Sequence, residues 1–311
     1  MKEHAMHTEK QRWGLVLAGG EGRRLHALTL DRDGTPVPKQ FCSLRGGPTL
    51  VQDTLARMGA CVDRDRTLAI VSAPHRPLWM RDLAALPRAN VIEQPSLRGT
   101  AAGILLPLLA LADRDPHARL LVMPSDHHVE QPARFVEAAL QALDDIEDDD
   151  ATTVLLGISP DGDDIDYGWI VPDEIDEHGR LRVRAFVEKP ARPRAITLRH
   201  RGAFWNSFVM ATSVPAMLGL FARRLPALLV ELARAHASGT IAQAWPELAV
   251  HDFSADVLAG SEASLRVAPV ASCGWTDLGT VARIAELRAR GASIATSDDE
   301  HAAPVLVRRS A

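Results

Sequence analysis

Short runs that are apolar at most positions, without alternating polar residues, alternate with stretches of helical periodicity through the first half of the chain. We expect strands at 13–18, 67–72, 91–93, 119–123 and 153–158, and helices at 49–60, 76–86, 100–112 and 133–143. Strands without a polar face lie in a sheet that is covered on both sides, and intervening helices make parallel connections. The pattern predicts an α/β fold with a doubly wound, mostly parallel sheet.

The second half of the chain has a different pattern. We expect short strands at 167–171 and 181–188 around a polar turn, followed by a helical block rich in Ala and Leu at 213–248. These elements predict a smaller α+β lobe beside the main sheet. Two acidic runs, 144–150 and 161–166, lack the spacing of metal ligands, so we interpret them as a solvated loop and a turn.

Charge and cysteine content exclude several classes of protein. The 311 residues carry 35 Lys and Arg against 40 Asp and Glu, and a net charge of −5 gives no general attraction to nucleic acid or to an anionic membrane. Three widely spaced cysteines form neither a CxxC metal pattern nor a disulfide framework, which favours a reducing compartment. The chain starts without an apolar leader, and its most apolar run, 101–112, is too short to span a membrane. We expect a soluble, cytoplasmic protein with no nucleic-acid or membrane partner.

A glycine-rich stretch, Leu17-Ala18-Gly19-Gly20-Glu21-Gly22-Arg23-Arg24-Leu25, directly follows the first expected strand. Glycines let backbone N–H groups approach phosphate oxygens, and phosphates bind outside the carboxyl ends of parallel strands. Taken alone, the stretch is equally consistent with a tight turn that carries surface arginines. It is no P-loop, which needs Lys-Ser or Lys-Thr after the glycines. It is no dinucleotide-binding GxGxxG either, since Leu25 stands in place of the third glycine.

Two further segments bring charged groups toward the same edge of the sheet. Prolines hold 36–38 extended and fix where Lys39 emerges, although a surface lysine is the plainer interpretation of that segment alone. Asp126 follows the fourth expected strand, which brings it to the crevice beside the glycine-rich stretch. A carboxylate there suits Mg²⁺, which takes one or two carboxylates, waters and substrate phosphates. His127 and His128 suit zinc better, and we interpret them as supporting or structural residues.

Together these segments resemble the sugar-1-phosphate nucleotidyltransferase family, and within it the mannose-1-phosphate guanylyltransferase branch. The family shows, in order, a GGxGTRL loop, PKQ, a Pro-x-x-Arg-x-Thr-Ala stretch, a DH pair, YGY, VEKP, WNSG and WSDxG. The corresponding segments here are Gly19–Leu25, Pro38–Gln40, Pro95–Ala101, Asp126-His127, Tyr167–Trp169, Val187–Pro190, Trp205–Ser207 and Trp275–Gly279. One short motif is weak support, but eight in the family order over residues 13–280 make the resemblance specific.

The resemblance implies a role for each matching residue. The catalytic residues would be Arg24, Lys39 and Asp126, of which Arg24 and Lys39 would stabilise charge at the α-phosphate and the leaving pyrophosphate. The nucleoside triphosphate would be bound by Leu17, Ala18, Gly19, Gly20, Gly22, Arg23, Gln94, Gly99, Thr100 and Ser125. The sugar phosphate would be bound by Tyr167, Gly168, Glu188, Lys189 and Asn206. Asp126 and Asp277 would share the Mg²⁺ ion.

These roles imply a reaction and a division of the chain. The phosphate oxygen of a hexose-1-phosphate would attack the α-phosphorus of an NTP; with GTP and mannose-1-phosphate the products are GDP-mannose and pyrophosphate. This chemistry needs positioning and positive charge, and no protein nucleophile. The resemblance implies a Rossmann-like nucleotidyltransferase domain at 13–290, with an NTP-binding half at 13–160 and a sugar-phosphate half at 161–290. Residues 1–12 and 291–311 would be tails, and the second is too short for the β-helix domain of many relatives. Whether the chain forms a homo-oligomer is left open.

Several positions depart from the family pattern. Arg23 replaces the Thr of the loop, Trp169 the second aromatic residue of YGY, Gly99 an Asn frequent in mannose enzymes, and Phe208 the Gly after Asn-Ser. The last two leave another nucleotide or another sugar-1-phosphate open. A non-catalytic nucleotide-sugar-binding regulator is a further alternative, although the charged residues assigned above all remain. A NAD-dependent dehydrogenase is disfavoured by the missing third glycine.

Overall fold

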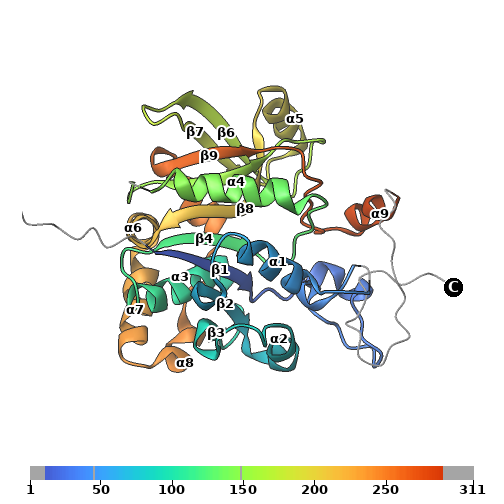
Figure 1. The fold of residues 1–311 in the computed structure, drawn as a ribbon, viewed down its shortest axis with the longest axis vertical. Coiled ribbons are helices and arrows are strands. Elements are labelled where there is room, and N and C mark those ends of the chain that lie inside the picture. Colours follow the sequence, from blue (N-terminus) through green and yellow to red (C-terminus); the bar gives the residue numbers. More distant parts are fainter. Residues whose placement is uncertain (1–10, 45, 148, 290–311) are drawn as a thin grey trace, which may run out of the picture.

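The computed structural model describes residues 11–44, 46–147 and 149–289. They form a nine-stranded sheet in the order β3-β2-β1-β4-β8-β5-β9-β7-β6, with helices on both faces (Figure 1). The strands are β1 (Arg12–Ala18), β2 (Thr67–Ser72), β3 (Val91–Gln94), β4 (Arg119–Pro124), β5 (Thr153–Ile158), β6 (Gly168–Ile175), β7 (Leu181–Glu188), β8 (Phe204–Ser213) and β9 (Leu265–Val270). The α-helices are α1 (Leu50–Gly59), α2 (Arg76–Asp82), α3 (Gly99–Ala112), α4 (Pro132–Asp144), α5 (Arg192–His200), α6 (Val214–Arg224), α7 (Pro226–Ala237), α8 (Ile241–Ala244) and α9 (Val281–Ala289).

β1, β2 and β4 are mostly apolar, and helices cover both faces of this part of the sheet. β1 pairs in parallel with β2 and β4, and β2 pairs in parallel with β3. Neighbouring side chains of a strand point to opposite faces. Leu15 of β1 therefore belongs to the core formed with α3, α6 and α7, and Val16 to the core formed with α1, α2 and α4. The predicted α/β class is confirmed.

The second part of the sheet is more antiparallel than the sequence pattern predicts. β8 lies antiparallel between β4 and β5, and the β6–β7 hairpin at the far edge contacts both β8 and β9 in antiparallel fashion. In this part of the described sheet, β5 and β9 form the parallel pair. Local periodicity carries no information on strand order, so it does not predict that β8 lies between two strands that precede it in the chain.

Several element boundaries agree with the sequence pattern and others do not. β2, β5 and β7 have the expected bounds, whereas α2 ends at Asp82 instead of residue 86, and β6 runs to Ile175 into the expected polar turn. The sequence pattern does not predict α5, β8 and β9. The expected tails fall mostly outside the described residues.

The acidic run 144–150 is less solvated than expected, whereas 161–166 forms the expected turn between β5 and β6. Asp144, the last residue of α4, is hydrogen bonded to Arg12, and Asp149 accepts a hydrogen bond of 2.8 Å from Arg180. Asp148 lies outside the described residues. The acidic run therefore tethers the end of α4 through arginines.

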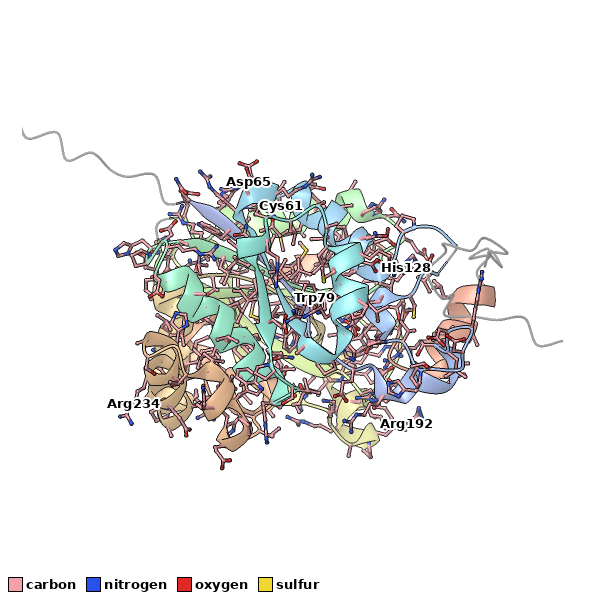
Figure 2. The ribbon with its side chains drawn as sticks, turned by 90° about the horizontal axis from the view of Figure 1, so that it is seen from below. Cys61, Asp65, Trp79, His128, Arg192 and Arg234 are labelled. Carbon is pink, nitrogen blue, oxygen red and sulfur yellow. The ribbon has the colours of Figure 1, made fainter. Side chains whose placement is uncertain are left out.

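Surface and interior side chains separate as the burial pattern indicates. Figure 2 shows Trp79 of α2 inside the molecule, whereas Arg192 of α5 and Arg234 of α7 project from surface helices. Within the described ranges, no helix combines the length and the apolar character needed to cross a bilayer.

The topology brings distant segments to one edge of the sheet. β1 and β4 end there because they are parallel, and β8 begins there because it is antiparallel to β4. The register pairs Gly157 at the end of β5 with Asn206 of β8, and Gly168 at the start of β6 with Glu188 at the end of β7. The glycine-rich stretch, Asp126, Asn206 and Glu188 therefore meet at this edge.

Candidate active site

Two cavities that share part of their lining lie at this edge of the sheet. The first, which we call the deep cavity, has a volume of about 370 Å³. Its sequence-predicted lining residues are Leu17, Gly19, Gly20, Gly22, Arg24, Gln94, Gly99, Thr100, Ser125, Asp126, Tyr167, Gly168, Glu188, Lys189, Asn206 and Asp277. The second, the arginine cavity, has a volume of about 710 Å³ and adds Arg23, Lys39 and Arg98. Both are lined by Arg24, Asp126 and Asp277, so the structure brings together all the predicted site residues except Ala18, which lines neither.

The glycine-rich stretch is held in place by the segment after the two prolines. The amide of Gln40 donates hydrogen bonds to the carbonyl oxygens of Ala18 (3.0 Å) and Gly20 (2.7 Å). Gly22 has a φ of 65°, and a Cβ added there would lie 3.0 Å from the backbone N of Lys39. Only glycine fits both the left-handed conformation and the close approach. Gln40 and Gly22 therefore fix the loop against this segment.

Gln94 offers a buried acceptor to the deep cavity. Its Nε2 donates to Ser72 Oγ (2.9 Å) and to the carbonyl oxygen of Gly19 (3.3 Å). These bonds fix the orientation of the amide, because in a flipped amide the Gln94 oxygen would face the Gly19 carbonyl oxygen, and both atoms are acceptors. Its Oε1 is buried and has no hydrogen-bond partner among the described residues. Such an atom is satisfied by a ligand or a water that donates an N–H or O–H.

The two loop arginines lie in different environments. Arg23 forms an ion pair with Glu21, and 78% of its side chain is exposed, so its charge is partly neutralised outside the deep cavity. Arg24 lines both cavities, and Arg98 joins it in the arginine cavity. Together with Lys39, these groups form the local positive cluster that a mildly acidic chain needs to hold an anion.

Lys39 links the two predicted metal-binding residues. Its side chain is buried, its Nζ lies 2.9 Å from Asp126 Oδ2, and it donates a hydrogen bond to the backbone carbonyl of Asp277. Burial alone would raise the pKa of the Asp126 carboxyl, but the charge of Lys39 and its hydrogen bond to the carboxylate outweigh it and hold the pKa below the usual value. Asp126 is therefore ionised at neutral pH.

His127 is kept neutral beside this cluster. Burial lowers the pKa of His127, against the opposing effect of Asp126 and Asp277. The indole N–H of Trp275 donates to His127 Nδ1 at 3.3 Å, so the proton of the neutral ring is on Nε2, which lies 3.6 Å from Asp126 Oδ1. His127 thus supports Asp126, in agreement with its interpretation as a supporting residue.

Asp277 is oriented by three donors to a single oxygen. Its Oδ1 accepts hydrogen bonds from the Tyr167 hydroxyl (3.1 Å), the Gly279 backbone N–H (2.8 Å) and Arg283 Nη1 (2.6 Å). The Arg283 guanidinium also pairs with Asp164 and lies 4.1 Å from the centre of the Tyr167 ring. Burial and the charge of Asp277 raise the pKa of Tyr167, so its hydroxyl stays protonated and donates.

The two carboxylates fit a magnesium ion by the chemistry of their donor atoms. Asp126 and Asp277 line the same two cavities, and both present hard carboxylate oxygens. No group of three or more His, Cys, Asp or Glu side chains that would suit a metal occurs in the described ranges. Two carboxylates without a full protein cage suit Mg²⁺, which keeps waters and binds substrate phosphates.

A further group of residues that line the deep cavity suits a sugar. Lys189 Nζ donates to Glu188 Oε1 at 2.7 Å, and burial, with a contribution from Asp252, raises the pKa of Glu188. Asn206 Oδ1 accepts a hydrogen bond from the backbone N–H of Phe208 (3.1 Å), which directs the Asn206 amide N–H₂ away from that bond. Carboxylate, ammonium and amide groups around one cavity bind hydroxyl and phosphate oxygens.

The sequence pattern does not identify several residues of the site. Asp252 and Ser254 line the deep cavity, but they follow a helical block that matches no motif. A hydrogen bond of 2.7 Å from the Phe253 N–H to Thr100 Oγ1 holds this segment against the start of α3. The motifs do not identify Arg283, because it lies beyond the last of them, Trp275–Gly279. Gln40 is the last residue of the Pro-Lys-Gln motif, so the sequence could have indicated its role in holding the glycine-rich loop.

The comparisons with known proteins agree with this geometry. A 28% identical match over 289 residues, covering 89% of this chain and 58% of the relative, is the alginate biosynthesis protein AlgA of Pseudomonas syringae pv. tomato. Mannose-1-phosphate guanylyltransferase ManC of Salmonella typhimurium is 33% identical over 205 residues, which are 62% of this chain and 41% of ManC. The chain spans about half the length of the curated relatives it matches.

Solved structures and a family model extend the match over the whole fold. A mannose-1-phosphate geranyltransferase from Thermus thermophilus superimposes with a TM-score of 0.76 at 29% identity, covering 86% of this chain and 76% of that protein. Residues 13–292 match the family model described as nucleotidyl transferase. Because that match takes in the glycine-rich loop, both cavities and their carboxylates, the chain belongs to the nucleotidyl transferase family.

Proposed function

We propose that the chain transfers GMP from GTP to mannose-1-phosphate, giving GDP-mannose and pyrophosphate. The observation that carries the proposal is the deep cavity, which joins the glycine-rich loop, two acidic residues and the Glu188–Lys189–Asn206 group in one space. A nucleotide and a sugar phosphate have to meet in one space for such a transfer. The names of the matched relatives support mannose-1-phosphate and GTP as the substrates.

The positive groups of the arginine cavity have a defined task in this reaction. The sugar phosphate and the triphosphate are both anions, and transfer requires the phosphate oxygen of the sugar to approach the α-phosphorus in line with the departing pyrophosphate. Arg24 and Lys39 would offset the repulsion and the charge on the leaving group. Lys189 would hold the sugar phosphate from the opposite side.

Asp126 and Asp277 would hold Mg²⁺ in the loaded enzyme. The ion supplies charge neutralisation and orientation of phosphate oxygens. Lys39 already ties these two residues together, and three donors orient Asp277, so both carboxylates are positioned before a metal arrives. This arrangement reduces the reorganisation needed on binding.

The unpaired acceptor of Gln94 favours a nucleotide whose base carries N–H donors. Gln94 Oε1 is buried without a hydrogen-bond partner among the described residues, and a Cβ added at Gly103 of α3, which lines the deep cavity as Gln94 does, would lie 3.4 Å from this oxygen. Guanine presents N–H donors along one edge. We therefore place the nucleoside in the half formed by residues 13–160 and the sugar in the half formed by 161–290.

A homo-oligomer and a cytoplasmic location stay predictions.

A pyrophosphate-release assay tests the proposal. The purified chain is given each of four NTPs with mannose-1-phosphate, glucose-1-phosphate and other hexose-1-phosphates, with Mg²⁺ or with a chelator. Mass spectrometry identifies the nucleotide sugar. GTP with mannose-1-phosphate is expected to give the highest rate, and the chelator is expected to stop the reaction. Turnover with another pair would correct the substrates, and nucleotide binding without turnover would favour a regulatory protein.

A further inference from the structure

Phe208 has a backbone conformation that side chains rarely adopt. Its φ is 58°, in the left-handed region, where a residue with a Cβ is strained. The neighbours impose this conformation: Asn206 Oδ1 accepts from the Phe208 N–H (3.1 Å), and Ser207 Oγ donates to the carbonyl of Leu156 (2.7 Å). Glycine would satisfy the same hydrogen bonds without strain. Strain of this kind concentrates at functional sites, so the phenyl ring needs an explanation other than backbone geometry.

The ring lies between the hydrophobic core and the deep cavity. Phe208 is only partly buried, and its ring centre lies 6.0 Å from that of Phe253 with an interplanar angle of 64°. Phe253 is fully buried and packs against Phe221 with ring centres 5.8 Å apart. Phe208 therefore rests on a fixed aromatic pair, and it lines the deep cavity. Its position is rigid rather than adaptable.

The polar groups around Phe208 are those expected to hold a sugar. Asn206 precedes it by two residues, and Asp252 and Ser254 flank the Phe253 on which its ring rests. Glu188 lines the same cavity as Asp252 and Ser254. An aromatic ring beside several hydroxyl-binding groups suits the apolar C–H face of a sugar ring.

We propose that Phe208 is a specificity-determining residue that limits the size of the sugar-1-phosphate. Its ring contacts unsubstituted hexoses and occupies the volume that an N-acetylhexosamine-1-phosphate would need. The inference rests on the proposed nucleotidyl transfer. Because the ring is backed by buried aromatic residues, it cannot move aside for a bulkier sugar.

The test is the selectivity of Phe208→Gly. The quantity measured is the ratio of kcat/KM for N-acetylglucosamine-1-phosphate to kcat/KM for the best unsubstituted hexose-1-phosphate, with the NTP that the wild type uses. The ratio is expected to rise at least about tenfold, the scale of discrimination set by a few carbon atoms in a pocket. Glycine fits the backbone at φ 58°, so the variant is expected to fold. Phe208→Asn, which also tolerates this conformation, gives a second measurement.

A matched control and the outcomes separate this inference from the proposed function. Phe204→Ala removes a partly buried ring of the same strand that packs on the same core and lines neither cavity, and its ratio is expected to stay at the wild-type value. Wild-type turnover with unsubstituted hexoses and unchanged ratios in both Phe208 variants would overturn the role of Phe208 alone. A wild type that prefers the N-acetylated substrate would do the same. No turnover by the wild type with any pair would overturn the transfer reaction and this inference together.

Discussion

Asp126 and Asp277 are held by different contacts, although both face the same cavities. Asp126 has 37% of its side chain exposed and pairs with one cation, Lys39. Asp277 is held through one oxygen by a hydroxyl, a backbone N–H and a guanidinium. In both cases the negative charge is compensated before any ligand binds. Replacing either carboxylate by an amide keeps the volume and removes the charge on which metal binding depends.

Asp126→Asn and Asp277→Asn are each expected to lower kcat by a factor of about 10² or more, because a metal-assisted transfer loses charge stabilisation of several kcal/mol. The measurement is pyrophosphate release at saturating substrates, with circular dichroism to verify folding. Asp113→Asn is the control, because Asp113 is exposed and pairs with His236 away from the cavities. Normal magnesium-dependent turnover by Asp277→Asn would remove Asp277 from the metal site.

Gly99→Ala tests why the start of α3 needs glycine. The φ of Gly99 is 78°, and an added Cβ would lie 2.2 Å from the carbonyl oxygen of His251. Alanine is therefore expected to lower the free energy of unfolding by about 2–4 kcal/mol, since the left-handed cost adds to a backbone clash. Urea unfolding measures the change. Gly59→Ala at the end of α1 meets nothing within 4 Å and is expected to change stability by less than about 1 kcal/mol. Equal stabilities would contradict the clash.

The elements differ in how far the sequence predicts them. β2 and β5 are buried at every position and mostly apolar, and their bounds are predicted correctly because burial on both faces leaves an unambiguous pattern. β8 is not predicted, although all its residues are at least partly buried. Its sequence begins with the Trp-Asn-Ser motif and continues as a short apolar run, so it shows no clear strand periodicity. Its place between β4 and β5 depends on long-range pairing. The motifs locate most of the cavity lining, whereas Asp252 and Arg283 reach the site only through tertiary packing.

The short helix α9 is connected to the site through one arginine. Arg283 has 10% of its side chain exposed and bridges Asp277 to Asp164, while its guanidinium lies over the Tyr167 ring. Burial lowers the pKa of Arg283, but the nearby carboxylates outweigh it and raise the pKa above the usual value. Arg283 thus orients the Asp277 carboxylate and also fixes α9.

Arg283→Ala is expected to lower kcat by about tenfold and to raise the magnesium concentration needed for half-maximal activity, because Asp277 loses a charged donor but keeps two others. Mn²⁺ binding followed by electron paramagnetic resonance gives a readout that does not depend on turnover. Arg283→Lys is expected to restore part of the affinity. If metal affinity were unchanged in the alanine variant, the role of Arg283 would be limited to anchoring α9.

At the scale of the whole molecule, a buried ion network ties the end of α4 to the far part of the sheet. Arg180 donates to Asp149 (2.8 Å) and Asp176 (3.0 Å), and Arg266 of β9 donates to the same Asp176 carboxylate (2.6 Å). Burial opposes ionisation of Asp149, but its hydrogen bonds with Thr152, Ala151 and Arg180 lower its pKa to about 2. The pKa of Asp176 is likewise held well below the usual range, against burial, first of all by Arg266.

These depressed pKa values give the network a defined pH dependence. A carboxylate whose folded pKa lies below its unfolded value stabilises the fold above the unfolded pKa, and the contribution is lost as the pH falls through the folded pKa. For Asp149 the unfolded value is 3.8 and the folded value about 2, so the loss falls between those pH values. Above about pH 4 the contribution is fully present.

Arg180→Ala is therefore expected to lower the free energy of unfolding at pH 7 by about 3 kcal/mol, because removing one partner leaves buried Asp176 with less compensation. Urea unfolding from pH 7 to pH 2 measures the difference from wild type, which is expected to shrink below about pH 4 as Asp149 becomes protonated. Arg182→Ala, which breaks an exposed pair with Glu177, is the control and is expected to cost less than about 1 kcal/mol. A difference that stays constant down to pH 2 would mean that the Arg180 side chain stabilises the fold by packing its methylene groups, because only charge pairing depends on the protonation of its partners.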